Sequence, residues 1–188
     1  MTAFKQKLFL RYFSIQTYFS RQKTTFFELP LLQTSGANIL VCLPGQEKKP
    51  EEAQFVLHSL KELFPKSKFF YIIAEKQLNN FQDQDLGIPV LYNPKDFSGF
   101  GILNKNWLKQ LPNNIALAID LNHSDDLWSG HLCFASRSPL RISFETRYAS
   151  KFFNFIVRTQ TKDSFQKQIE QLLNYIRAIS RPTQKTLV

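Results

Sequence analysis

Several residue types and motifs are scarce in this chain of 188 residues, and each scarcity excludes some classes of protein. The two cysteines, Cys42 and Cys133, lie in apolar contexts outside any CxxC pair, which indicates buried thiols in a reducing compartment. No apolar run reaches the roughly 18 residues that cross a bilayer, so we expect no transmembrane helix. The amino terminus lacks an apolar segment followed by a small-residue cleavage site, so we expect a cytoplasmic protein without a secretory signal.

Motifs for metal binding, phosphate binding and nucleophilic catalysis are also missing. The three histidines, His58, His123 and His131, have no paired metal-ligand spacing, so we expect no metal. No GxGxxG or GxxxxGK[ST] sequence follows the first apolar run, and no GxSxG frame surrounds a serine. These gaps favour a non-catalytic protein over an enzyme, and they predict no cofactor.

The chain has a net charge of +9, and one part of it contains no acidic residue. Residues 1–27 contain five cations, eight aromatic rings and no acid, and residues 137–188 contain 10 basic and 3 acidic side chains. Such basic ends indicate an anionic partner, either a protein complex, an anionic membrane surface or nucleic acid. The cations expected to bind it are Lys5, Lys7, Arg11, Arg21, Arg147 and Lys151.

The first 37 residues are predicted to form a basic aromatic helical arm followed by a linker. An apolar stripe with helical spacing is made by Phe4, Leu8, Tyr12, Ile15 and Phe19. Three roles stay open for this arm: packing on its own domain, lying peripherally on the inner face of a membrane, or serving as an organelle-targeting presequence.

Residues 38–180 alternate apolar runs of strand length with amphipathic helices. The expected strands span 38–45, 68–75, 88–94, 115–121, 140–145 and, as a sixth, 152–158. The expected helices span 50–64, 104–111, 125–137 and 164–180. Strands that are apolar on both faces need a sheet covered on both sides. We therefore predict a single Rossmann-like three-layer α/β domain with a mostly parallel sheet of five to six strands, followed by a loose tail at 181–188.

Polar residues follow two of the predicted strands, where the carboxyl ends of parallel strands form the usual ligand edge. The candidate ligand-binding residues are Gly45, Glu47, Asp120, Asn122, His123 and Asp126. Asp120, His123 and Asp126 could form a metal or acid–base set. Alternatively, Ser124 or Asp125 caps the following helix while Asp120 fixes the loop. The residue types favour this cap-and-loop interpretation.

Two stretches resemble the amino-terminal half of the family 9, heptosyltransferase-like glycosyltransferases: "NILVCLPG…HSLKELFPKSKFFYII" and "IALAIDLNHSDDLWSGHLCFASRSPLRISFE". This resemblance covers roughly residues 38–146. The chain is also similar to a set of short Bacteroidetes-type proteins with the same half-domain, which share its "IDLN" strand and its "QIEQLLNYI" helix. Both resemblances imply a Rossmann-like fold.

The resemblance also implies that this chain lacks the donor-binding half and the catalytic base of these glycosyltransferases. The glycosyltransferases bind their nucleotide-sugar donor mostly through a second Rossmann-like half, which has no counterpart in this sequence. Their expected base is the Asp of a Gly-Asp pair, whereas Gly45 is followed here by Gln46, and Glu47 is the nearest carboxylate. We therefore expect a non-catalytic binding or assembly module that docks on a larger protein complex or a membrane surface. The alternatives are a glycosyl- or nucleotide-handling enzyme completed by another chain, and an RNA- or nucleic-acid-binding accessory protein.

Overall fold

The computed structural model describes most of the chain between the arm and the last helix. The described residues are 7–11, 13, 36–44, 50–81, 86–123, 125, 127–160 and 163–180. Within them, no helix is both long enough and apolar enough to cross a membrane.

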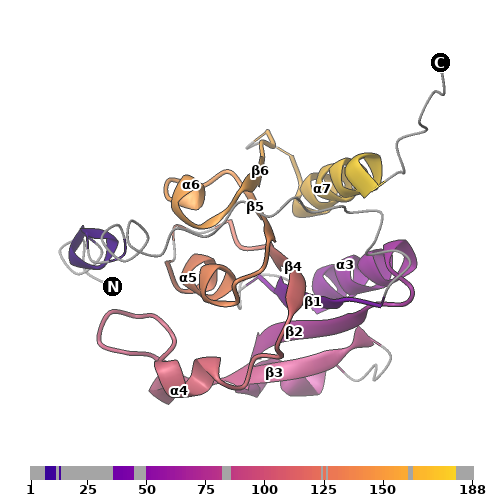
Figure 1. Ribbon diagram of the computed structural model, residues 1–188. Helices are drawn as coiled ribbons and strands as arrows, with labels where there is room; N and C mark the ends of the chain where they lie inside the picture. Colours follow the sequence, from indigo (N-terminus) through magenta and orange to yellow (C-terminus); the bar gives the residue numbers. More distant parts are fainter. Residues whose placement is uncertain are drawn as a thin grey trace.

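A six-stranded sheet forms the centre of the molecule (Figure 1). Its strands are β1 (Asn38–Cys42), β2 (Lys68–Ala74), β3 (Ile88–Tyr92), β4 (Ile115–Asp120), β5 (Leu140–Phe144) and β6 (Phe155–Val157). Their order is β3-β2-β1-β4-β5-β6, and every neighbouring pair is parallel. This is the doubly wound order of Rossmann-like folds. The predicted fold class is confirmed.

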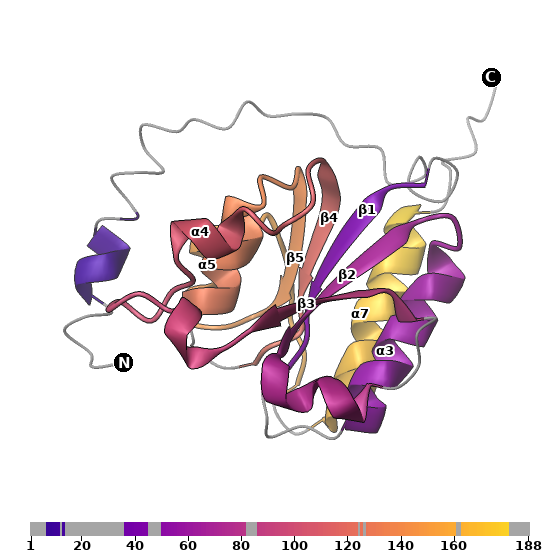
Figure 2. The same cartoon turned by 90° about the horizontal axis from the view of Figure 1, so that it is seen from below.

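Helices cover both faces of the sheet. The α-helices are α3 (Pro50–Leu63), α4 (Lys105–Leu108), α5 (Leu127–Ala135), α6 (Ala149–Phe152) and α7 (Phe165–Ser180), and the short 3₁₀ helices are η1 (Glu75–Asn80) and η3 (Pro94–Asp96). Figures 1 and 2 show α3 and α7 together on one face, with α4 and α5 on the other. Helix α6 packs beside α5. The domain therefore has three layers.

Strands β1, β2, β3 and β4 each contribute to two separate cores because successive side chains point to opposite faces. In β1, Ile39 and Val41 join the core under α3 and α7, whereas Leu40 and Cys42 join the core under α5. All four are fully buried. This two-sided burial explains why the strands are apolar throughout.

The two long helices bury the stripes that their sequences predict. Apolar residues at helical spacing face the sheet and pack into one cluster, while the opposite sides of both helices are exposed. The buried residues are Ala53, Val56, Leu57, Leu60 and Phe64 for α3, and Phe165, Ile169, Leu172, Leu173 and Ile176 for α7.

The region after β5 differs from the sequence prediction. The segment 152–158 was expected to be extended throughout, but Phe152 ends helix α6 and β6 begins only at Phe155. Local backbone hydrogen bonds close this turn, from the Lys151 N–H to the Tyr148 carbonyl and from the Phe153 N–H to the Ala149 carbonyl. The Arg141 Nε also donates a hydrogen bond of 2.7 Å to the Phe152 carbonyl oxygen. The prediction was wrong for Phe152.

The described part of the arm packs on the domain through Phe9 and Phe13. Residues 7–11 and 13 are helical, and Phe9 and Phe13 are 3% and 1% exposed. Leu8, a member of the predicted apolar stripe, is 48% exposed. The other predicted stripe residues, Phe4, Tyr12, Ile15 and Phe19, lie outside the described residues.

Candidate functional site

The carboxyl end of β4 holds the polar cluster that the sequence singles out. Asp120 is the last residue of the strand and is 4% exposed. Its Oδ1 accepts hydrogen bonds from the Asn122 backbone N–H at 3.0 Å and from the Asn122 Nδ2 at 2.7 Å. Asn122 is itself buried. Asp120 therefore fixes the turn after β4, which supports the loop interpretation for this residue.

The remaining members of the cluster turn toward different partners. The His123 ring stacks on Phe144 with a centroid distance of 4.1 Å and lies 5.8 Å from Phe165, on the α7 side of the sheet. Asp125 instead accepts a hydrogen bond of 3.1 Å from the Arg147 backbone N–H. The two side chains thus contact different residues, His123 the last residue of β5 and Asp125 a residue after β5. Gly45, Glu47, Ser124 and Asp126 lie outside the described residues.

A small hollow lies beside Asp120 at this strand end. It measures about 10 Å³, which is room for about one water molecule. No group of three or more potential metal ligands occurs among the residues that are described. The hollow is lined by Asp120, Asn122, Asp125, Gly130, Thr146, Tyr148, Ala149, Phe152 and Phe153.

Two cysteines that are distant in sequence meet under α5. The Sγ atoms of Cys42 in β1 and Cys133 in α5 are 3.6 Å apart, and both residues are fully buried. Burial raises the pKa of both thiols, so neither forms a reactive thiolate near neutral pH. The sequence predicted their burial but not their contact, since 91 residues separate them.

Aromatic rings attach the arm to α5 and α6. The Phe13 ring centroid lies 4.8 Å from that of Phe134 in α5 and 4.7 Å from that of Phe152 in α6. The Phe9 ring centroid lies 5.8 Å from that of Phe13 and 5.6 Å from that of His131. Buried rings of this kind contribute about 3 to 5 kcal/mol each relative to alanine, so these two residues hold the arm in place.

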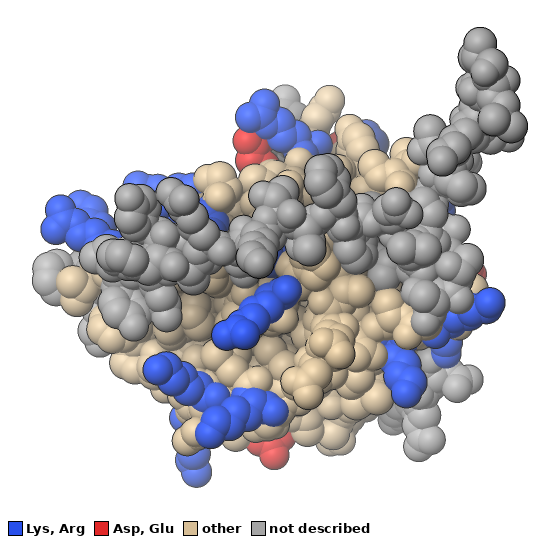
Figure 3. Space-filling model, in the orientation of Figure 1, with Lys and Arg blue, Asp and Glu red and all other residues tan. Residues whose placement is uncertain are grey.

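The attached arm brings two groups of predicted partner-binding cations onto neighbouring elements. Lys7 and Arg11 are exposed on the arm, and Arg147 and Lys151 are exposed at α6, where Lys151 adjoins the Phe152 that contacts Phe13. We name these four cations the arm–α6 surface. Figure 3 shows Lys and Arg side chains on the left of the molecule, around the arm and α6. Lys5 and Arg21 lie outside the described residues.

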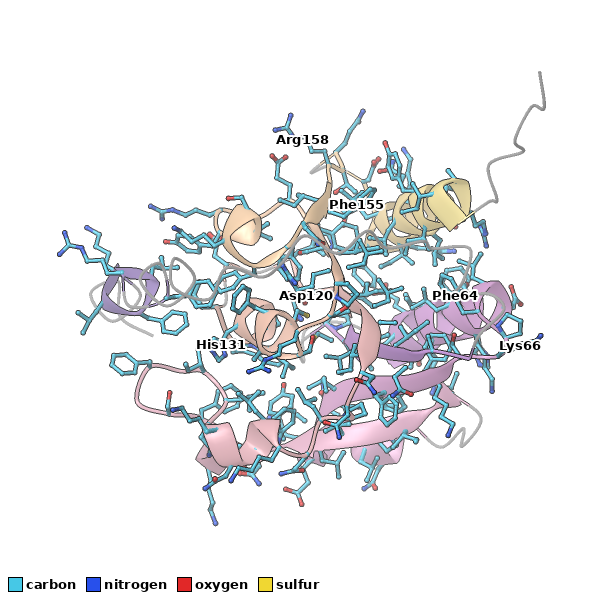
Figure 4. The ribbon with its side chains drawn as sticks, viewed as in Figure 1. Phe64, Lys66, Asp120, His131, Phe155 and Arg158 are labelled. Atoms are coloured by element: carbon cyan, nitrogen blue, oxygen red, sulfur yellow. The ribbon has the colours of Figure 1, made fainter. Side chains whose placement is uncertain are left out.

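His131 lies beneath the arm with an unusual environment. Its Nδ1 is buried and has no hydrogen-bond partner in the described structure, and its ring faces Phe9 and Phe13 (Figure 4). Burial lowers the pKa of His131 to about 4 from its ordinary 6.5. The histidine is therefore neutral at physiological pH while the arm is docked.

The basic carboxyl third directs several of its phenylalanine rings into the interior. Phe144, Phe152 and Phe153 are buried in the two cores. Arg141 in the same region is only 8% exposed. It donates hydrogen bonds to the carbonyl oxygens of Phe152 and Ser138 at 2.7 and 2.6 Å. Arg141 thus helps to hold the chain around α6.

The fold and this site define a Rossmann-like α/β domain with a small hollow beside Asp120 and an arm that carries exposed cations. No protein family, curated protein or solved structure matches the chain.

Proposed function

We propose that the protein is a non-catalytic binding or assembly module that docks through its arm–α6 surface on an anionic partner, an acidic protein complex or a membrane surface. The observation that carries this proposal is the burial of Phe9 and Phe13 against α5 and α6. It attaches the helix that carries Lys7 and Arg11 to α6, which carries Lys151, although more than 130 residues separate the two elements in sequence.

The chemistry of the strand end supports a non-catalytic role. The Asp120 carboxylate accepts two hydrogen bonds from Asn122, and the hollow beside it has room for about one water molecule. Small-molecule sites usually need roughly 300 Å³ or more. The surface cations, in contrast, are accessible to a large partner.

The expected binding is electrostatic and reversible. A lysine or arginine near an anionic lipid surface contributes about 1 kcal/mol, so the four cations together contribute about 4 kcal/mol. This corresponds to a Kd of about 1 mM before the remaining positive charge of the chain is counted. Since such exposed charges are screened by salt, binding should weaken strongly as ionic strength rises.

Vesicle co-sedimentation with a charge-reversal pair tests this proposal. The full-length protein should bind vesicles of phosphatidylcholine and phosphatidylserine but not vesicles of phosphatidylcholine alone. Lys7→Glu/Arg11→Glu should lose most of that binding. The matched control is Lys66→Glu/Lys68→Glu, which reverses the same number of exposed charges away from the arm (Lys66 in Figure 4).

The same variants separate the two kinds of partner. If the partner is an acidic protein complex, affinity purification from the native source should recover it with the control variant and lose it with the arm variant, and vesicle binding should be absent. Equal behaviour of the two variants in both assays would refute the proposal.

A further inference from the structure

Residues 97–103, between η3 and α4, form a closed hairpin loop with a phenylalanine at its tip. Phe97 and Leu103 pair across its base as an antiparallel bridge, and the Gly101 N–H donates a hydrogen bond of 2.8 Å to the Ser98 carbonyl. Gly101 has a φ of 69°, a backbone conformation that favours glycine. This turn holds Phe100 at the end of the loop, where the side chain is 42% exposed.

The base of the hairpin loop is anchored in the domain. Leu103 is buried, and the Phe97 ring centroid lies 5.5 Å from that of Tyr92 and 6.0 Å from that of Trp128. Burying Phe100 inside the domain would require these contacts to break. The exposure of Phe100 is therefore built into the fold.

The arm presents a second exposed apolar side chain beside this loop. Figures 1 and 2 both show the hairpin loop, which leads into α4, lying next to the arm helix. Phe9 and Phe13 attach that helix to the domain, whereas Leu8 on the same helix is 48% exposed. Two neighbouring elements thus carry exposed apolar side chains on the same side of the molecule.

The two elements also carry an excess of positive charge. Lys7 and Arg11 are exposed on the arm, and residues 93–109 contain three exposed lysines and one acid. That acid, Asp96, accepts a hydrogen bond of 2.8 Å from the Asn93 N–H. Figure 3 shows Lys and Arg side chains around the arm and around α4. Apolar tips among cations match an anionic bilayer, whose headgroups attract the cations while its acyl boundary accepts the apolar side chains.

We propose that the partner of the arm–α6 surface is an anionic lipid bilayer, and that Leu8 and Phe100 insert into its interface. This inference rests on the proposed function, since it needs the cations of the arm to bind an anionic partner. It adds a hydrophobic contribution, because insertion removes both apolar side chains from water. An acidic protein surface would satisfy the cations but leave these two side chains against charged groups.

Vesicle co-sedimentation with Leu8→Ser/Phe100→Ser tests insertion separately from charge, because this variant keeps every cation. Its binding to vesicles of phosphatidylcholine and phosphatidylserine should be weaker than that of the unmodified full chain by about tenfold or more. The matched control is Phe55→Ser/Ile88→Ser, which removes side chains that are 40% and 51% exposed on α3 and β3. The control should bind like the unmodified protein, and circular dichroism checks that both variants are folded.

Tryptophan fluorescence reports the insertion directly. Phe100→Trp keeps an apolar ring at the tip of the hairpin loop. Vesicles of brominated phosphatidylcholine and phosphatidylserine should quench the added fluorescence of this variant. Phe55→Trp, with its ring on α3, should show no quenching beyond that of the unmodified protein.

The outcomes separate this inference from the proposed function. Salt-sensitive vesicle binding that Leu8→Ser/Phe100→Ser leaves unchanged, without quenching of Phe100→Trp, would overturn the inference and leave electrostatic docking intact. Absent vesicle binding, with recovery of an acidic protein complex that depends on the arm cations, would have the same meaning. Equal vesicle binding by Lys7→Glu/Arg11→Glu and the unmodified protein would refute the proposed function, and the inference with it.

Discussion

The partly buried His131 makes the stability of this protein depend on pH in a defined direction. In the folded state its pKa is about 4, and its ordinary value is 6.5. Between these values the unfolded chain binds a proton that the folded protein excludes. Stability is therefore unaffected by this group above about pH 6.5, and it decreases as the pH falls toward 4.

The size of this effect follows from the two pKa values. A difference of one pKa unit corresponds to about 1.4 kcal/mol, so the full decrease by pH 4 is about 3 kcal/mol, and about 2 kcal/mol is lost by pH 5. Residues 1–27 contain no acid, so the arm that covers His131 offers no counter-charge to a protonated ring. These are upper values, because detachment of the arm would let His131 bind its proton without global unfolding.

Urea unfolding followed by circular dichroism at pH 7.5 and pH 5 measures the effect. His131→Phe keeps an aromatic ring at the position but cannot titrate. Carboxylates contribute equally to both proteins, so the unmodified protein should lose up to about 2 kcal/mol more than the variant between these pH values. An NMR titration of the His131 ring gives the pKa directly. Equal pH dependence of the two proteins, or a ring pKa near 6.5, would refute the reasoning.

Three further predictions concern the core under α5. Arg141→Met removes the donors to two buried carbonyl oxygens and should lower the free energy of unfolding by about 2 to 4 kcal/mol in urea titrations, and an unchanged midpoint would contradict this. Cys42 and Cys133 should react with Ellman's reagent only after unfolding, since burial raises the pKa of both thiols. Fast reaction of the folded protein would contradict this prediction. Gly130→Ala places a Cβ 2.7 Å from the Phe152 ring and should destabilise the protein by about 1 to 2 kcal/mol in thermal denaturation, despite the better helix propensity of alanine.

The elements of the sheet and its two long helices could be predicted because their signals are local. A run such as Ile39 to Cys42 is apolar at every position, and this property alone indicates a strand covered on both faces. The stripe of α7 likewise needs only a spacing of three to four residues. Predicted ends were longer than the observed elements by a few residues, since hydrogen bonding at the ends depends on neighbours.

The candidate site was only partly predictable. The sequence placed Asp120 at a strand end, but the bonds to Asn122 that occupy its carboxylate are a matter of loop geometry. The periodicity of the arm indicated an apolar stripe but not which residues of the arm pack on the domain. The contacts of Phe13 with Phe134 in α5 and Phe152 in α6 exist only in the folded structure.

By itself, the sequence determined the layered α/β class and the excess of positive charge at both ends of the chain, because composition and periodicity are properties of neighbouring residues. The tertiary structure decided which elements bring their cations together by packing on one another and which histidine lies under the arm. Those outcomes depend on contacts such as that of Phe13 with Phe152, which join residues far apart in the chain and form only when the elements pack together.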